Sequence, residues 1–517
     1  MRGLVRYVPH SIVFATSMGI MIVELVASRL VAKYLGNSLF TWTSVIGVVL
    51  GGISLGNWLG GRLADRFKPR ALIPVLLLAS SLLTFLVIAL DLAVSRITRV
   101  LGVDVMTMSL LVRSILLIVS LFFLPSCALG TISPVMAKYA LEGTSGIGKT
   151  VGGMYAFGSL GSIAGTFLAG YVLIPRLGLT MNVLAVGIAL ALLSLAMGGK
   201  RIFAGTWLIV LALVTATGAP QALARRLIAD PEGRKVLVFS KDSPYSYIQV
   251  TDTRYNGDLE RTLRLDALIH NRYDPNNRDA LLYEYERIFA SLTVEAAGAS
   301  AGAFSTLTIG GGGFTLPAYL ERHYPSARHE VVEIDPEVIE TAYRFFDLPR
   351  DTAIRIATAD ARIYVDSVRG KKLYDIVYCD AFNAYSVPTH LTTKEFVLKI
   401  AEILSPDGIY MTNCIDILDS GGFLNAYINT LRSVFPQVSA YMSPDSAADT
   451  RSTFVVVAGE KLIAADVLLS ADGTVAGKRM QPEMMADLRM RNGEAVLTDD
   501  HAPVETLMAP VFLRSVK

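Results

Sequence analysis

One stretch of the sequence, 306–336, constrains the fold more than any other. It reads TLTIGGGGFTLPAYLERHYPSARHEVVEIDP. The apolar run 307–309 predicts a short strand, and four glycines, Gly310 to Gly313, predict a turn after it. Helical spacing over 315–323 and a second apolar run over 331–334 complete a strand, glycine turn, helix and strand. The stretch therefore predicts one βαβ unit.

The same stretch predicts a ligand site at the carboxyl ends of its strands. Gly310, Gly311 and Gly312 let the backbone approach a ligand closely. Glu333 and Asp335 end the second strand, about 20 residues on, where an acid accepts the hydroxyl groups of a ribose. A nucleoside-containing cofactor is therefore the first hypothesis.

The 517 residues are too many for one ordinary domain. Apolar residues make up 52% of the chain and charged residues 18%, but these averages combine two unlike halves. We expect a transmembrane domain over 1–220, a connector and β-rich subdomain over 221–300, and an α/β catalytic domain over 301–517. With a net charge of +2 and no basic tract, the sequence gives no argument for nucleic-acid binding. Cys127, Cys379 and Cys414 are too far apart for a metal or disulfide pattern, and no metal is expected.

The apolar half contains runs long enough to cross a bilayer. Six spans are predicted at 9–32, 40–60, 70–92, 108–130, 153–174 and 180–198. A seventh at 202–219 is shorter and contains three threonines. The chain is therefore expected to be a multi-pass protein of a cell (inner) membrane.

Basic residues in short loops predict the orientation of the spans. The loop GGRLADRFKPR after the second span holds three arginines and a lysine, which places it and the amino terminus inside. If 202–219 crosses, the soluble half lies outside the cytoplasm, and if it does not, the soluble half lies inside. Both orientations stay open.

The segment GNWLGGRLADR resembles the loop between the second and third helices of major facilitator transporters. The resemblance covers about six spans and implies a half-transporter-like bundle. Glu24 and Arg29 lie near membrane depth, where such side chains are functional, form an internal ion pair or, as Arg29 can, snorkel to the interface. Glycines such as Gly56, Gly161 and Gly165 are expected to form packing seams.

In the soluble half, strands are predicted at 236–239, 247–251, 261–265, 354–357, 374–379 and 409–413, with helices at 279–297, 336–346 and 393–404. Alternating strands and helices predict a mostly parallel Rossmann-like sheet with helices on both faces. Gly310, Glu333, Asp360 and Asp380 then fall at the carboxyl ends of strands, where ligands bind.

With these motifs the soluble half resembles a polyamine aminopropyltransferase of the spermidine synthase type, whose fold is that of class I S-adenosylmethionine-dependent methyltransferases. The matching segments are SPYSYIQV, RTLRLDALIH, IGGGG, VVEIDPEVIE, ADA and YDIVYCDAF. The resemblance implies that Glu333 binds the ribose, that Asp360 and Ala361 meet the adenine, and that Asp380 takes the proton of the substrate amine.

The sequence departs from the family pattern at four positions. Gly313 stands where an acid pairs with the amine of decarboxylated S-adenosylmethionine, so space is expected there. Asn383 replaces the second Asp of the substrate loop, and Ser246 and His270 replace glutamines. The pocket therefore offers a dication less negative charge than the family does.

Other residues are candidates for the substrate side. Tyr285 matches a family tyrosine, although its spacing also fits core packing. Tyr385 and His390 lie in the loop after Asp380, and His390 is equally placed to cap the next helix. The segment DAFNAYSVPTHLTTKEF, with LTDDHAPVE near the carboxyl end, resembles a subgroup of this family in which the domain is fused to membrane spans.

The predicted function is that of a membrane-anchored transferase that uses decarboxylated S-adenosylmethionine or S-adenosylmethionine as co-substrate. An amine such as putrescine would accept the transferred group, with release of methylthioadenosine. Two alternatives stay open: a methyltransferase or S-adenosylmethionine-cleaving enzyme, and a nucleoside-sensing domain on a half-transporter. The resemblance also implies a homodimer.

Overall fold

The computed structural model describes residues 8–35, 39–100, 110–142, 146–198, 235–255, 258–297, 304–381, 388–461 and 463–513. The chain forms two compact units. The first comprises Met1–Pro231 with Ser240–Ser246, and the second comprises Glu232–Phe239 with Tyr247–Lys517.

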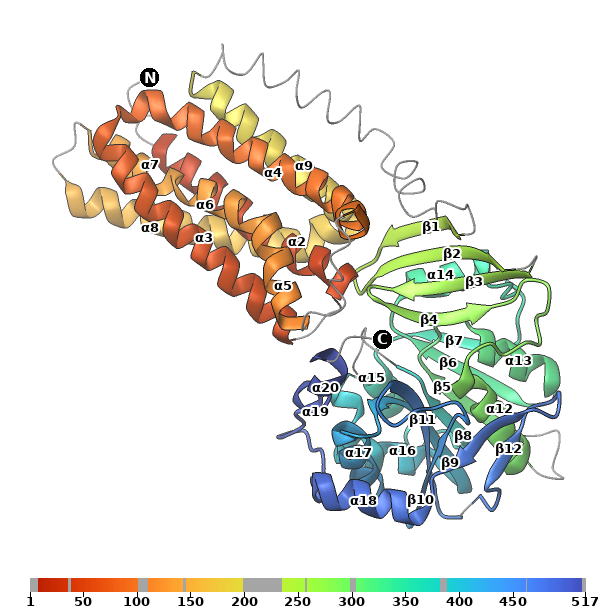
Figure 1. The fold of residues 1–517 in the computed structure, drawn as a ribbon. Coiled ribbons are helices and arrows are strands. Elements are labelled where there is room, and N and C mark those ends of the chain that lie inside the picture. Colours follow the sequence, from red (N-terminus) through yellow and green to blue (C-terminus); the bar gives the residue numbers. More distant parts are fainter. Residues whose placement is uncertain are drawn as a thin grey trace. The chain divides into compact units, whose positions relative to one another are not determined.

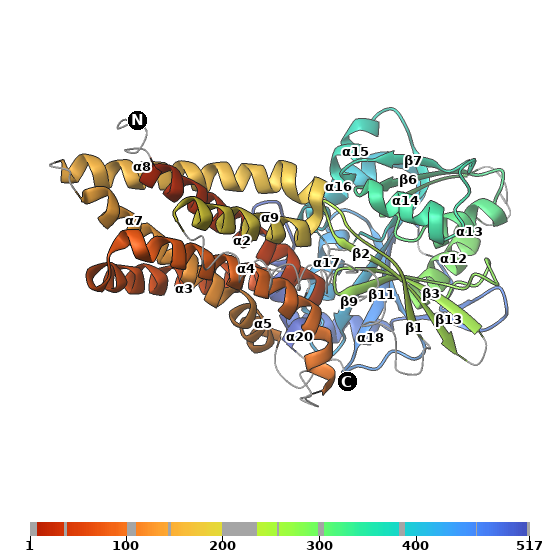
Figure 2. The same cartoon turned by 90° about the horizontal axis from the view of Figure 1, so that it is seen from above.

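The first unit is helical, and α3, α4 and α8 are long continuous helices in it (Figures 1 and 2). Its elements are α2 Val8–Leu35, α3 Leu39–Arg66, α4 Pro69–Val100, α5 Leu110–Ile118, η2 Val119–Phe123, α6 Leu124–Gly130, α7 Ile132–Leu141, α8 Ile147–Leu168, η3 Ala169–Leu173 and α9 Ile174–Ala196.

Five segments of this unit are long and apolar enough to cross a membrane: Val8–Ala32, Thr41–Arg66, Pro69–Asp91, Ser114–Leu141 and Ile147–Ala196. The last contains the predicted spans 153–174 and most of 180–198, and its helix is broken at Gly178, where φ is +73°. The predicted seventh span lies outside the described residues.

The predicted loop GGRLADRFKPR is wrong over most of its length, because α3 continues through it to Arg66. Within this segment Asp65 pairs with Lys138 of α7 at 3.3 Å. The predicted packing seams are confirmed at Gly56, Gly161 and Gly165. A Cβ at Gly56 would lie 2.1 Å from the carbonyl oxygen of Cys127, and one at Gly161 would lie 2.2 Å from that of Phe14.

A small four-stranded sheet, predicted from the sequence as a β-rich subdomain, lies mostly in the second unit. Its strands lie in the order β1-β2-β3-β4. Their bounds are β1 Lys235–Asp242, β2 Tyr247–Tyr255, β3 Asp258–Leu265 and β4 Leu268–Tyr273. The sequence analysis missed β4.

A nine-stranded sheet forms the body of the unit, in the order β12-β13-β10-β11-β9-β8-β5-β6-β7. The strands are β5 Ser305–Ile309, β6 Arg328–Glu333, β7 Arg355–Thr358, β8 Tyr374–Cys379, β9 Leu404–Ile417, β10 Gln437–Met442, β11 Arg451–Gly459, β12 Val467–Leu469 and β13 Val475–Arg479. The helices are α12 Glu284–Ala297, α13 Thr315–His323, α14 Pro336–Phe345, α15 Ala361–Val368, η4 Thr389–Leu391, α16 Lys394–Ile403, α17 Gly422–Arg432, α18 Pro482–Asn492, α19 Val504–Leu507 and α20 Ala509–Leu513.

The sheet is mixed, which corrects the prediction of a mostly parallel one. Strands β7, β6, β5, β8 and β9 are parallel. Beyond β9 the pairing becomes antiparallel, because β11 runs back against β9 and β10 against β11.

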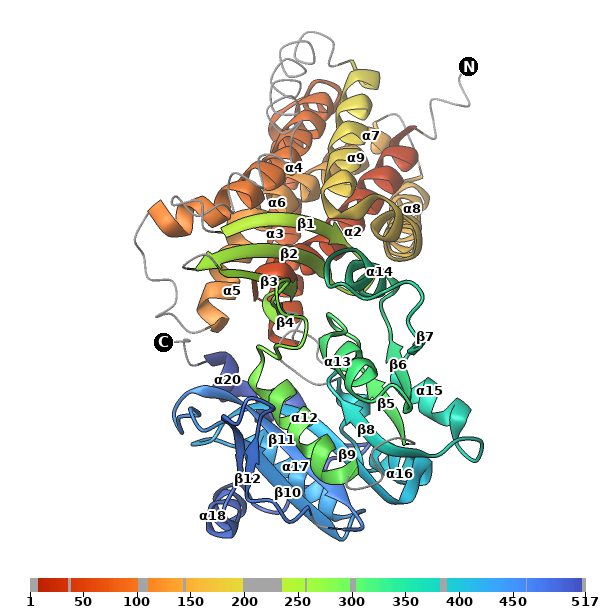
Figure 3. The same ribbon diagram turned by 90° about the vertical axis from the view of Figure 1, so that its right-hand side faces the viewer.

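Helices cover both faces of this sheet, as predicted. On one face lie α12 and α13 (Figure 3), whose side chains pack in one cluster with Tyr378 and Met411. On the other face, the hydroxyl of Tyr410 in β9 lies 3.0 Å from the hydroxyl of Tyr427 in α17. Tyr410 and Met411 are consecutive in β9, so their side chains point to opposite faces.

The parallel strands bring the predicted site residues to one edge. β5 lies between β6 and β8, and the chain reverses its direction of travel across the sheet there. The amide of Asp380 donates to the carbonyl oxygen of Ile309 at 2.8 Å, so the ends of β5 and β8 adjoin. Open α/β sheets bind ligands at such a reversal.

Candidate active site

The glycine turn packs directly on the end of β8. Gly310 has φ of +92°, and a Cβ there would lie 2.5 Å from the carbonyl oxygen of Asp380. Gly311 is equally confined, because a Cβ would lie 2.5 Å from the ring of Phe314. Gly312 has φ of +49°, and a Cβ there would lie 3.8 Å from the carbonyl oxygen of His270. The turn thus exposes its backbone beside Asp380. Any side chain at Gly310 would push the turn away from Asp380.

Glu333 holds the turn from the neighbouring strand. Its Oε2 accepts a hydrogen bond from the amide of Gly311 at 2.7 Å, and its Oε1 accepts one from the amide of Asp335 at 2.9 Å. The side chain is 9% exposed, and burial raises the pKa of its carboxyl. The Glu333 carboxylate therefore ties the glycine turn to the end of β6.

The structure gives Asp335 and Asp360 the geometry of helix caps. Asp335 is buried, and its Oδ1 accepts from the amide of Glu337 at the start of α14. Asp360 accepts from the amide of Ile363, and Ala361 is the first residue of α15. Each of the two side chains therefore caps the first turn of the helix that follows it.

His390 lies at the Asp360 end of the edge. Its Nε2 is 2.9 Å from Oδ2 of Asp360. The helix that follows is capped by Thr393. Nearby, Asp499 accepts hydrogen bonds at 2.7 Å from both Arg362 and Thr393, and Arg362 lowers the pKa of that carboxyl to about 2. His390 is therefore a neighbour of the predicted adenine contact.

Asp380 is held by two side chains. Its Oδ2 accepts from the hydroxyl of Tyr285 at 2.7 Å, and its Oδ1 accepts from Nδ2 of Asn413 at 3.0 Å. Part of its surface faces a cavity, but the surrounding protein desolvates the carboxylate and raises its pKa to about 6. A carboxylate with such a pKa can take a proton near neutral pH.

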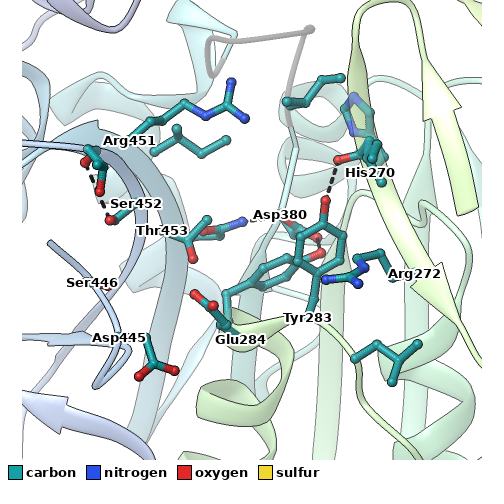
Figure 4. A pocket seen from close by; sticks show the side chains of 17 residues that line it. His270, Arg272, Tyr283, Glu284, Asp380, Asp445, Ser446, Arg451, Ser452 and Thr453 are labelled. Carbon is teal, nitrogen blue, oxygen red and sulfur yellow. Dashed lines mark hydrogen bonds between the residues drawn. The ribbon is translucent and has the colours of Figure 1, made fainter. Parts of the chain in front are cut away.

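A cavity of about 290 Å³ opens beside Asp380 (Figure 4). It is bounded by β4, the start of α12 with the residues before it, the ends of β8 and β9, and the start of β11 with the segment before it. The hydroxyl of Tyr283 donates to the carbonyl oxygen of Ile269 at 2.8 Å and fixes one wall. The structure thus brings His270, Tyr285 and Asp380 to one cavity.

His270 faces this cavity as a neutral side chain. Burial, with the charge of Arg264, lowers its pKa to about 4. Its Nε2 is enclosed and has no hydrogen-bond partner among the described residues. A buried ring nitrogen of this kind is a place for a ligand hydrogen bond.

Sequence reasoning missed two residues of the site. Asn413 ends the predicted strand 409–413, but nothing in its local pattern indicates a bond to Asp380. Glu286 is 3% exposed on α12, and burial, with the charge of Asp380, raises its pKa to about 8. Both depend on tertiary contacts between distant segments.

The expectation of free space at Gly313 is wrong. A Cβ there would lie 2.5 Å from Cγ and 2.6 Å from Oδ1 of Asn271. The side chain of Asn271, on the missed strand β4, fills the place of the expected acid.

The predicted substrate residues Asn383 and Tyr385 lie outside the described residues. Within the part of the chain that the structure describes, no three His, Cys, Asp or Glu side chains gather closely enough to hold a metal ion.

Comparisons with known proteins relate part of this chain to one family. Residues 296–465 match the spermine/spermidine synthase domain family. The polyamine aminopropyltransferase of Vibrio vulnificus is 34% identical over 145 residues, which are 28% of this chain and 47% of that protein. The probable polyamine aminopropyl transferase of Bifidobacterium longum is 25% identical over 288 residues, 52% of this chain and 62% of that protein.

The crystal structure of a probable spermidine synthase from Corynebacterium glutamicum is similar at 21% identity and a TM-score of 0.43, over 52% of this chain and 97% of that one. The chain spans about half to three fifths of the length of the two curated relatives it matches.

Proposed function

We propose that the chain is a transferase that uses a sulfonium nucleoside, because residues 296–465 match the spermine/spermidine synthase domain family. The transferred group is of the aminopropyl type, and the acceptor is an amine such as putrescine. The observation that carries the proposal is the position of Asp380 between the glycine turn and the cavity, held by Tyr285 and Asn413.

The residues present fit a nucleoside of this kind. Gly310 and Gly312 expose backbone that a side chain would otherwise cover, and Glu333 offers two carboxylate oxygens beside the turn. Asp360 stands at the end of β7 for the adenine, with His390 next to it. A sulfonium supplies an electrophilic carbon and a neutral thioether as leaving group.

The cavity suits an amine acceptor. Three acids line it, Asp380, Glu284 and Asp445, against two arginines. One of these, Arg272, is already paired with Glu260 through two hydrogen bonds of 2.9 and 2.7 Å. The three acids outnumber the one other arginine, and this excess of negative charge favours a cationic ligand.

Asp380 then acts on the acceptor. An ammonium has no lone pair, so the amine must lose its proton before it attacks the carbon next to sulfur. Asp380, with a pKa of about 6, takes that proton, and the hydrogen bonds from Tyr285 and Asn413 fix the direction of its carboxylate. Positioning of the two reactants supplies the rest of the rate enhancement.

The test is release of methylthioadenosine by the purified full-length protein incubated with putrescine and, separately, with the intact and the decarboxylated form of S-adenosylmethionine. Asp380→Asn should lower the rate by about 10²- to 10⁴-fold, the range for loss of a general base. Asp407→Asn, at an exposed ion pair with Lys461, is the matched control and should leave the rate unchanged. Full activity of Asp380→Asn would remove the catalytic assignment.

We further propose that the first unit anchors the enzyme in a membrane. Its five long apolar segments have mean hydropathies between 1.4 and 2.6. Such segments insert into a bilayer because their backbone hydrogen bonds are satisfied internally. Sodium carbonate extraction should leave the protein in the membrane pellet, and release into the supernatant would refute the anchor.

A further inference from the structure

The glycine turn cannot carry an acid, because Asn271 occupies the space beside Gly313. The distances of 2.5 to 2.9 Å from a Cβ at Gly313 to three atoms of Asn271 leave no room for a carboxylate side chain. Asn271 is itself fixed, since its Nδ2 donates to Oγ1 of Thr315 at 2.6 Å. The pair Gly313 and Asn271 therefore places no charged side chain at this end of the turn.

Two further features describe this end of the turn. Oδ1 of Asn271, in a side chain that is 2% exposed, has no hydrogen-bond partner among the described residues, so it presents the negative end of a dipole without a net charge. Helix α13 begins at Thr315, and its cap residue Phe314 provides no side-chain hydrogen bond. An uncapped helix amino terminus attracts a negative group.

The acids nearest the turn are Glu333 and Asp380, and each is held in place by hydrogen bonds to the protein. Both oxygens of Glu333 accept backbone amides, and both oxygens of Asp380 accept side-chain donors. An ammonium alone would thus face a neutral amide and the positive end of a helix. A headgroup with both an ammonium and a carboxylate matches this surface better.

Resting on the proposed function, we infer that the co-substrate is the intact, zwitterionic S-adenosylmethionine and that the transferred group is 3-amino-3-carboxypropyl. The nitrogen lone pair of the acceptor forms a bond to the chain carbon next to sulfur. The bond between that carbon and sulfur breaks, its electrons stay on sulfur, and methylthioadenosine leaves. The proton lost by the amine goes to Asp380, and no oxidant or further reactant is needed.

The test compares the affinities of three compounds for the full-length protein in detergent by titration calorimetry: S-adenosylmethionine, its decarboxylated form and methylthioadenosine. The wild type should bind intact S-adenosylmethionine at least about tenfold more tightly than the decarboxylated form. Asn271→Asp adds an acid without changing the size of the side chain. Asn271→Ala with Gly313→Asp removes the clash and places an acid on the turn.

Both variants should shift the preference by about tenfold or more toward the decarboxylated form, since an acid repels a carboxylate and attracts an ammonium. Methylthioadenosine has neither group, so the variants should bind it as the wild type does. Asn492→Asp, where the amide bonds the carbonyl oxygen of Leu488 in α18, is the matched control and should keep the wild-type preference.

A wild-type preference for the decarboxylated form, or an unchanged preference in both variants, would overturn the inference while leaving the proposed function intact. Absence of methylthioadenosine binding would instead overturn the proposed function itself. With putrescine and intact S-adenosylmethionine, mass spectrometry should find a product that retains the carboxylate.

Discussion

The hydroxyl of Tyr285 donates a hydrogen bond to Oδ2 of Asp380 over 2.7 Å and joins residues 95 positions apart in the chain. Tyr285 is 6% exposed and also packs in the core with Phe289, so the same helix that fills the core aims the hydroxyl. Core packing and site geometry are therefore two roles of one side chain.

Removal of this hydroxyl should change the pH dependence of the reaction. Burial raises the pKa of Asp380 to about 6, and the hydrogen bonds from Asn413 and Tyr285 oppose that rise. Tyr285→Phe removes one of them, so the pKa rises further, and the acidic limb of the rate profile should move up by roughly half to one pH unit. Tyr283→Phe, whose hydroxyl bonds the backbone of Ile269, is the control. Identical limbs in the two variants would contradict the role of Tyr285.

Loss of Glu333 should weaken nucleoside binding. Glu333→Ala removes the acceptor for the amides of Gly311 and Asp335 and the proposed ribose contact. We expect the affinity for methylthioadenosine to fall about 10- to 100-fold, as for loss of one or two charged hydrogen bonds. Glu340→Ala, at an exposed ion pair with Arg350, is the calorimetric control. Equal affinities in the two variants would remove Glu333 from the site.

A side chain at Gly310 should damage the site beyond its effect on the backbone. Gly310 and Gly473 both have positive φ, but a Cβ at Gly473 meets open space, whereas one at Gly310 meets Asp380. Both alanine substitutions should cost about 1 kcal/mol of stability or more. Only Gly310→Ala should also abolish methylthioadenosine release. Retained activity in a folded Gly310→Ala protein would show that the turn tolerates displacement.

The buried carboxyl of Glu286 should make stability depend on pH. Its pKa is raised from 4.5 to about 8, so the folded state favours the neutral form. The stability that this form contributes is complete below about pH 4.5 and is lost as the pH rises through about 8. Between about pH 5 and 9, the Tm of Glu286→Gln should therefore fall by several degrees less than the Tm of the wild type. The exposed Glu295→Gln on the same helix should follow the wild type.

The sequence predicted the centre of the sheet well because its signals are local. Helix α13 begins just after the glycines, and β8 coincides with a continuous apolar run. Both elements, Thr315–His323 and Tyr374–Cys379, have the predicted limits. Asp380 and Glu333 could be assigned to one edge because parallel strands align their carboxyl ends.

The remaining features depend on contacts between distant segments. Strand β4 escaped prediction because polar residues, His270 and Asn271 among them, interrupt its apolar pattern. Without β4, nothing indicated that Asn271 fills the space at Gly313. The antiparallel strands beyond β9 and the bond from Asn413 to Asp380 likewise follow from tertiary pairing.

The most direct test of the account is the stoichiometry of product formation. The full-length protein is incubated with putrescine and with each form of the nucleoside, intact and decarboxylated, and methylthioadenosine and alkylated putrescine are quantified together. The account predicts equal amounts of the two products, dependent on putrescine and lost in Asp380→Asn. Nucleoside binding without methylthioadenosine release from either form would contradict it and favour a sensing domain.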